Sequence, residues 1–174
     1  MKVEIEKDIQ KGLVGSKILL SGSVCPDINS TNSFEFQDKR YLPFYYHLGK
    51  HIKPEKVLQV NPKLGLVASC FLKSCNSVNK WDVLGDFDRF IYSNLSKKVE
   101  LSFLKETKDL YDLCLITGDF SREQLSLVWP LIKSEGFLVV DYIKDNDVFQ
   151  EFVGTQSRDL SYFDTRYGVG LVKK

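Results

Sequence analysis

The sequence lacks the features that mark several large classes of protein. No apolar stretch approaches the roughly 20 residues that a membrane-spanning helix needs, and the opening MKVEIEKDIQKG lacks the apolar centre of a signal peptide. Neither sign of charge dominates, because 24 Lys and Arg stand against 23 Asp and Glu. We therefore expect no membrane partner, and the charge balance gives no reason to expect nucleic acid as the main partner.

Cysteine is scarce, and its spacing excludes the common zinc motifs. Cys25, Cys70, Cys75 and Cys114 show none of the intervals typical of metal sites. The last three lie among apolar residues, which favours buried free thiols in a reducing compartment. Of the 174 residues, 43% are hydrophobic and 27% charged, as in ordinary globular proteins. We expect a soluble, cytoplasmic protein with a single domain.

Short apolar runs alternate with helical patterns along most of the chain. The helical patterns lie at 65–75, 87–96, 121–135 and 145–153, and the expected strands lie at 56–60, 77–83, 98–103, 111–117, 137–142, 160–165 and 167–174. The last two strands have a short connection, so they must be antiparallel. The pattern predicts an α/β fold: a doubly wound, mainly parallel, seven-stranded Rossmann-like sheet with an antiparallel C-terminal strand pair.

The start of the chain is less regular. Residues 1–33 are turn-rich and are predicted to form an irregular N-terminal extension, whereas 34–174 form the α/β domain. Residues 34–52 are expected to be helical on both sides of Pro43, and either to pack over the sheet or to form a lid.

Local sequence signals also predict where the helix after the 111–117 strand begins and ends, and which strand follows it. Ser121 opens SREQ, a capping-box pattern that predicts the start of a helix. Pro130 should kink or shorten this helix, and Gly136 should end it. The run FLVVDY at 137–142 has almost no alternation, which is typical of a parallel strand covered on both faces.

The stretch VLQVNPKLG, residues 57–65, predicts a strand, a tight turn and the start of a helix. In doubly wound sheets, ligands bind outside the carboxyl ends of the strands, near the point where the strand order reverses. The turn at 61–65 belongs at that place, which makes it the candidate ligand loop.

The order of these pieces resembles the class I S-adenosylmethionine-dependent methyltransferases. The likeness covers residues 57–174 and rests on the strand–turn–helix at 57–75, the acid Asp82 ending the second strand, LITGDFSREQLSLVWPLIKSEGFLVVDY, and the final TRYGVGLVKK. It is greatest for small-molecule members whose fourth strand ends in Asp-Gly-Asp-His. The resemblance implies S-adenosylmethionine as cofactor and a small molecule as methyl acceptor.

Carried over residue by residue, the resemblance implies a cofactor site at Gln59, Asn61, Gly65, Asp82 and Asp119. Gln59 replaces the acid that holds the methionine amino group, so it can accept a hydrogen bond but supplies no charge. Asn61 replaces a glycine, and Asn tolerates positive φ better than most residues. Gly65 is retained. Asp82 stands where the family has the acid for both ribose hydroxyls, although a solvated acid at a strand end explains it equally well.

The fourth strand departs further from the family pattern. Asp-Gly-Asp-His becomes Thr117, Gly118, Asp119 and Phe120, which removes a metal-ligating carboxylate and the histidine. Asp141 is followed by Tyr142, not by a second oxygen ligand, and a hard cation needs several. We therefore predict no metal site, and the sequence identifies no catalytic residue.

Two functions remain open. The chain is either a methyltransferase with a diverged S-adenosylmethionine site, acting on a small molecule, or a catalytically inactive structural or assembly subunit of a larger particle, with a protein partner. Gly65 and Asp82 favour the first function, because they keep parts of the cofactor site. Gln59, Asn61, Thr117 and Phe120 favour the second, because a fold can persist after its site has decayed.

Overall fold

A computed structural model describes residues 41–62, 65–85, 99–144, 146–156 and 160–174. The elements in chain order are α3 (Tyr41–His51), β1 (Lys56–Val60), α4 (Leu66–Ser74), β2 (Lys80–Leu84), β3 (Glu100–Leu104), β4 (Tyr111–Ile116), α6 (Arg122–Val128), the 3-10 turn η1 (Trp129–Leu131), β5 (Ile132–Asp141), α7 (Asp147–Gln156), β6 (Leu160–Phe163) and β7 (Val169–Lys173). The extension 1–33 and the helix expected at 87–96 lie outside the described residues.

The strands form one seven-stranded sheet in the order β3-β2-β1-β4-β5-β7-β6. All pairs from β3 to β5 are parallel, and β7 runs antiparallel to both β5 and β6. This confirms the predicted doubly wound sheet with an antiparallel C-terminal pair. No helix in the described part of the chain is long and apolar enough to cross a membrane.

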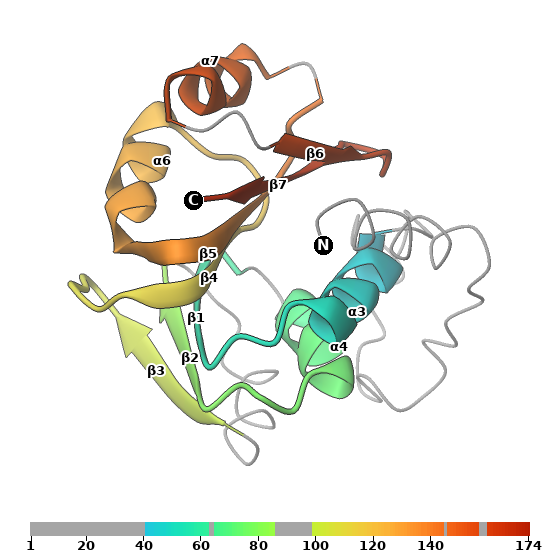
Figure 1. Ribbon diagram of the computed structural model, residues 1–174, viewed down its shortest axis with the longest axis vertical. Helices are drawn as coiled ribbons and strands as arrows, with labels where there is room; N and C mark the ends of the chain where they lie inside the picture. The colour runs from blue at the N-terminus through green and yellow to red at the C-terminus, as the bar shows by residue number, and fades with distance from the viewer. Residues whose placement is uncertain (1–40, 63–64, 86–98, 145, 157–159) are drawn as a thin grey trace.

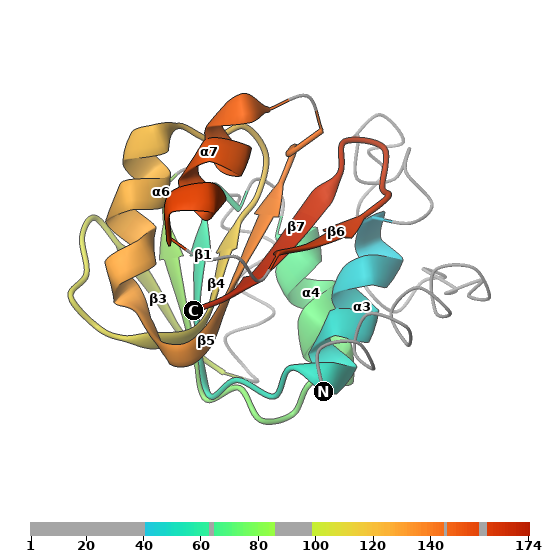
Figure 2. The ribbon, with the colours of Figure 1, turned by 45° about the horizontal axis from the view of Figure 1, so that its top comes forward.

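Helices cover both faces of the sheet, with α3 and α4 on one face and α6 and α7 on the other (Figure 1). Figure 2 shows the same two layers from a second direction, with the β6–β7 hairpin near α3. Each face has its own apolar cluster, and alternate residues of the central strands belong to the two clusters. Central strands covered on both faces are expected to be almost wholly buried. This expectation is confirmed, because exposure is at most 3% for each of Leu58, Val60, Leu113, Leu115, Leu138 and Val140.

Helix α3 is part of the core. Pro43 is its third residue, a position in the first turn where the missing N–H breaks no internal hydrogen bond. Tyr41, Phe44 and Leu48 are almost wholly buried, and the Phe44 ring lies 4.9 Å from that of Phe163 on β6. Of the two alternatives for this segment, packing over the sheet is confirmed for residues 41–51, while 34–40 lie outside the described residues.

The helix that follows β4 is shorter than predicted. Its capping box is confirmed, since the Ser121 side chain accepts from the Gln124 backbone N–H and Gln124 accepts from the Ser121 N–H. It ends at Val128, however, and the turn η1 contains Pro130. Gly136 does not end a helix but lies within β5, beside an irregular register against β4 and the positive φ of Glu135. A bulge of this kind accommodates polar, turn-like residues inside a strand.

Candidate functional site

The carboxyl ends of β1 and β4 meet at the centre of the sheet, where the strand order reverses. Three turns leave this edge with a residue in the left-handed conformation: Asn61 after β1 has φ 54°, Gly85 after β2 has φ 99° and Gly118 after β4 has φ 83°. Gly65, at the start of α4, has φ 74°. The described residues of the predicted ligand loop, 61, 62 and 65, therefore lie at the switch point. Asn61 adopts the backbone conformation that the family glycine would favour.

The Asn61 side chain lies between the three turns. Its Nδ2 donates to the backbone oxygen of Asp119 at 3.3 Å. Its Oδ1 lies only 2.8 Å from where a Cβ on Gly85 would be, so a larger residue at Gly85 would collide with it. Asn61 thus joins the β1 turn to the β4 turn, in space that a glycine at position 61 would leave open.

Gln59 and Thr117 form a buried pair across β1 and β4. Gln59 is fully buried and Thr117 is 4% exposed. The Gln59 Nε2 donates to Thr117 Oγ1 at 3.3 Å, and Thr117 Oγ1 lies 2.8 Å from the Asn61 carbonyl oxygen and 3.1 Å from that of Val60. Gln59 and Asn61, two of the predicted site residues, are thereby linked through Thr117.

Asp141, the last residue of β5, extends this polar edge by one strand. The last paired residues of the three neighbouring strands are Val60, Ile116 and Val140. The residues that directly follow them, Asn61, Thr117 and Asp141, therefore lie side by side. The Asp141 carboxylate is 1% exposed and accepts hydrogen bonds from the hydroxyls of Tyr41 and Tyr45 on α3. Hydroxyl donors of this kind offset the free energy of burying a carboxylate.

Sequence reasoning did not assign Tyr41 and Tyr45 to this edge. They lie 100 and 96 residues from Asp141 in the sequence. No local sequence pattern in either segment predicts their hydrogen bonds to the Asp141 carboxylate. The available signal was the cluster of aromatic residues around Pro43, and aromatic residues at such spacing form a core more often than they line a pocket.

Asp82 does not lie where the sequence placed it. Strand β2 runs to Leu84, so Asp82 is its middle residue and not its last. The fully buried carboxylate accepts from Tyr111 Oη at 2.6 Å and lies 3.2 Å from Lys80 Nζ. Tyr111 and Lys80 are the first residues of β4 and β2, so Asp82 contacts groups at the opposite edge of the sheet from Asn61. Burial and the neighbouring Asp82 raise the pKa of Tyr111, which keeps its hydroxyl protonated as a donor.

The residues that follow β4 separate into two environments. Asp119 is exposed in the turn, and its backbone oxygen accepts from Asn61. Phe120 is half-buried, and its ring lies 6.2 Å from that of Phe149 on α7 in an edge-to-face contact. Phe120 therefore packs with the α6–α7 face, and Asp119 stays at the candidate site.

An aromatic pair lies beside Asp141. Tyr142, with φ 59°, stacks on Tyr167 with ring centroids 4.4 Å apart, and the Arg166 guanidinium lies 5.2 Å from the Tyr167 centroid. Positive φ is uncommon for a bulky residue, and such strain is found preferentially at functional sites. These residues place an aromatic surface at the same edge of the sheet.

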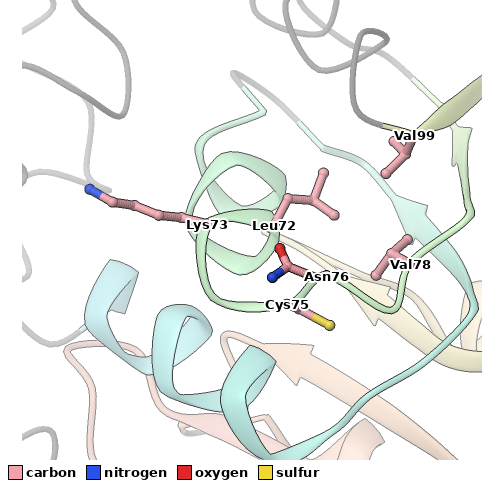
Figure 3. Close-up of a pocket in the computed structure, with 6 residues that line it drawn as sticks. All are labelled: Leu72, Lys73, Cys75, Asn76, Val78 and Val99. Atoms are coloured by element: carbon pink, nitrogen blue, oxygen red, sulfur yellow. The ribbon is translucent and has the colours of Figure 1, made fainter.

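A separate pocket of about 340 Å³ lies at the opposite edge, where α4 ends and β2 and β3 begin. Figure 3 shows the Lys73 side chain pointing away from the other lining residues, which are Leu72, Cys75, Asn76, Val78 and Val99. Among the described residues, no group of three or more His, Cys, Asp or Glu could hold a metal ion.

Comparison with known proteins shows similarity through structure alone. No known sequence family matches the chain, and neither does any protein in a search of curated sequences. Solved structures do match. A candidate caffeoyl-CoA O-methyltransferase from Staphylococcus aureus aligns with a TM-score of 0.63 at 11% identity, covering 76% of this chain and 82% of that one.

Two further structures were solved with a cofactor or its product. The methyltransferase PaMTH1 of Podospora anserina, bound to S-adenosylhomocysteine, aligns with a TM-score of 0.61 at 10% identity over 98% of this chain and 86% of that one. The O-methyltransferase TomG of Streptomyces achromogenes, involved in tomaymycin synthesis and bound to S-adenosylmethionine, gives 0.55 at 12% identity over 74% and 77%. At such identities the likeness shows the fold: this chain resembles the class I S-adenosylmethionine-dependent methyltransferases in its Rossmann-like architecture.

Proposed function

We propose that this chain binds S-adenosylmethionine at the carboxyl ends of β1 and β4, and that it transfers the methyl group to a small molecule. The observation that carries the proposal is the set of left-handed turns that converge at the switch point, at Asn61, Gly85 and Gly118, together with Gly65 at the start of α4. Such turns bring backbone groups close to a ligand, as nucleotide-type ligands in this class of sheet require.

The residues at this edge fit such a ligand, with a weaker anchor than a carboxylate would provide. Gln59 would accept from the amino group, and the missing side chain of Gly65 would let the backbone approach. The side chain of Asn61 would have to share its space with the ligand. Because a neutral amide gains less from an ammonium group than a carboxylate does, we expect weak affinity. Asp82 is not part of the set, because its carboxylate contacts Tyr111 and Lys80 at the other edge of the sheet.

S-adenosylmethionine, when bound, supplies an electrophilic methyl group. The contribution expected of this chain is alignment and exclusion of water, because Phe120 offers no base at the position where the family has a histidine. Proximity and orientation alone can supply a large share of the rate enhancement of such a transfer. The acceptor is expected beside Asp141 and the Tyr142–Tyr167 pair, where aromatic rings would suit a small organic molecule.

The second candidate is a structural or assembly role with a protein partner, and one observation favours it. Buried polar groups at the edge already pair within the chain, Asp141 with Tyr41 and Tyr45 and Gln59 with Thr117. Groups paired in this way are stable without a ligand, so the fold could persist without methyl transfer. For either role, the balance of charges gives no electrostatic support for nucleic acid as the main partner.

Calorimetric titration with S-adenosylmethionine and S-adenosylhomocysteine tests the proposal. We expect saturable heat in the micromolar range, and Gly65→Val should abolish it because a branched side chain cannot readily adopt φ 74°. Gly154→Ala in α7 is the control, since an added Cβ there meets nothing within 4 Å apart from its chain neighbours and the nearby backbone of its own helix. If the parent protein gave no binding heat at millimolar ligand, this result would contradict the proposal and favour the assembly role.

A further inference from the structure

The connection between β3 and β4 is too short to contain a crossover helix. Residues 105–110 join the end of β3 to the start of β4, although β2 and β1 lie between these strands in the sheet. Parallel strands are normally joined by a dozen or more residues, usually with a helix that covers the sheet. The β3–β4 connection therefore crosses the sheet without a helix to cover it.

The connection runs over the face of the sheet that carries α6. The crossover from β1 to β2 contains α4 and runs toward β3, whereas the crossover from β3 to β4 runs back, so right-handed connections place them on opposite faces. The contacts agree, because the Asp109 carboxylate lies 3.1 Å from Lys80 Nζ, and Leu84, on the same side of β2 as Lys80, packs in the cluster with α6. Figure 1 shows α7 and α6 on this face, and the described part of the chain has no helix beyond them over β2 and β3.

Apolar side chains are exposed beside this part of the sheet. Leu110, the last residue of the connection, is 51% exposed, and Leu127 on α6 is 57% exposed. On the sheet itself, Leu84 and Leu104 are register partners on this face and are partly exposed. We call these four residues the uncovered surface.

Leu127 lies on the side of α6 that faces away from α7. Arg122 and Trp129 contact α7, through an ion pair and an edge-to-face ring contact. Leu125 and Val128 are fully buried in the cluster on the sheet. Because successive residues of a helix are about 100° apart, Leu127 points to the side opposite α7, toward β2 and β3.

We propose that a second copy of this chain covers the uncovered surface, in a two-fold contact in which α6 of each copy lies over β2 and β3 of the other. The surface supplies both halves of such a contact: a part of the sheet that no described helix covers, and beside it a helix with an exposed apolar side. A contact of this kind is isologous and closes as a dimer. The inference goes beyond the proposed function and does not depend on it, because the ligand site lies at the carboxyl ends of β1 and β4.

Charges beside the uncovered surface favour the same arrangement. Lys105 and Lys108 in the connection are exposed and form no ion pair with the described residues. Besides Asp109, which pairs with a lysine of β2, the connection has one acid, Glu106. Glu123 is exposed on α6, one turn before Leu127. With α6 of one copy over β2 and β3 of the other, Glu123 approaches the two lysines of that copy, so opposite charges meet.

Sedimentation velocity over a series of protein concentrations tests the proposal. We expect the parent protein to pass from monomer to dimer in the micromolar range, so that dilute protein is monomeric, because a contact of this size is weak. Leu127→Glu should raise the dissociation constant by about tenfold or more, since a charge replaces an apolar side chain that the contact buries. Gln150→Glu is the control, because it adds the same charge at an exposed position of α7 and should leave the dissociation constant unchanged.

A charge exchange tests the arrangement of the two copies. Glu123→Lys alone, and Lys105→Glu with Lys108→Glu, should each raise the dissociation constant by about threefold, as exposed ion pairs are worth little. The variant with all three substitutions should recover most of the parent affinity, because the opposite charges meet again. An additive loss in this triple variant would overturn the proposed arrangement.

Two further results would overturn the proposal. One is a parent protein that remains monomeric at millimolar concentration. The other is a dimer whose dissociation constant changes neither in Leu127→Glu nor in Leu110→Glu, since these substitutions alter the uncovered surface from α6 and from the connection. Circular dichroism shows that each variant is folded, and Leu110→Glu replaces Leu127→Glu in the test if the latter does not fold.

Discussion

Asn61 is the residue at which the local backbone and the ligand site make opposing demands. Its φ of 54° is the left-handed conformation that glycine adopts without strain, and asparagine is among the few other residues that tolerate it. Its side chain also joins the β1 turn to the Asp119 backbone across the switch point. Asn61 therefore stabilises the β1 turn, while its side chain occupies space that a ligand at the switch point would need.

We predict that Asn61→Gly combined with Gln59→Glu improves S-adenosylmethionine binding more than either change alone. The glycine would remove the side chain between the turns, and the carboxylate would meet the ammonium group. Each contact depends on the other having placed the ligand, so the two changes should couple by about 0.5–3 kcal/mol. Calorimetry on the parent, the two single variants and the double variant measures this coupling free energy. A folded double variant that binds no better than the parent would show that the pocket is blocked elsewhere.

Asp82 provides a contrasting prediction at the same scale. The sequence alone suggested that Asp82→Ala would remove the gain of the repaired site by taking an acceptor from the ribose. The observed contacts with Tyr111 and Lys80 lead to a different expectation. Asp82→Ala should leave ligand affinity unchanged and lower the free energy of unfolding by about 1–3 kcal/mol, because the buried Tyr111 hydroxyl loses an acceptor. Urea unfolding and calorimetry on the same variant check both parts, and a loss of affinity without a loss of stability would contradict it.

Among the elements, the amino ends of β1, β4 and β5 are joined by one carboxylate. Asp112 accepts from the backbone N–H groups of Glu55 and Lys56, at 3.0 and 2.8 Å, and from Lys133 Nζ at 2.6 Å. Partial burial alone would raise the pKa of Asp112, but these donors outweigh it and lower the pKa below its usual value.

This lowered pKa gives a pH dependence with a definite sign. Since the folded state binds the Asp112 proton more weakly than the unfolded state, its stabilising contribution is present above the unfolded pKa of about 4. It is lost as the pH falls through the lower folded pKa. We predict that Asp112→Asn is less stable than the parent at neutral pH, and that this difference shrinks at about pH 3 and below. Urea unfolding at both pH values tests it, and a difference independent of pH would contradict the assignment.

Strand β4 is the central element of the sheet, between β1 and β5. Leu115 is fully buried in the cluster beneath α3 and α4. Leu115→Ala should therefore lower the free energy of unfolding by about 2–5 kcal/mol, through lost burial and the cavity that remains. Leu127→Ala on α6 is the control, because Leu127 is 57% exposed and its loss should matter by less than about 0.5 kcal/mol. A cost well under 1 kcal/mol for Leu115→Ala would contradict a central position.

The whole molecule should show graded stability across its sheet. Strands β1, β4 and β5 are covered on both faces, whereas the five residues of the edge strand β3 are all partly or fully exposed. We predict that amide hydrogens of β1 and β4 exchange only by global unfolding, and that those of β3 exchange earlier through local opening. Hydrogen exchange resolved by residue measures this, and equal protection of β3 and β4 would show that the edge does not open separately.

The sequence by itself determined the order and type of most elements. Alternation between short apolar runs and amphipathic segments is a local pattern, and so are the capping box at Ser121 and the unalternating run at 137–142. These predicted the doubly wound sheet, its antiparallel end and the buried residues of β1, β4 and β5. The same local reasoning placed the β1–α4 turn at the switch point and correctly allowed for positive φ at Asn61.

Only the tertiary structure decided which side chains meet. The end of β2 depends on pairing with β1, where Val60 lies opposite Leu84, and that register moved Asp82 away from the expected site. Gly136 joined β5 because β4 offered it a partner strand, an interaction that no turn signal in the sequence reveals. The contacts of Asp141 with α3 and of Gln59 with Thr117 join residues far apart in the chain. Such contacts are set by strand register and helix packing, which local patterns constrain but do not specify.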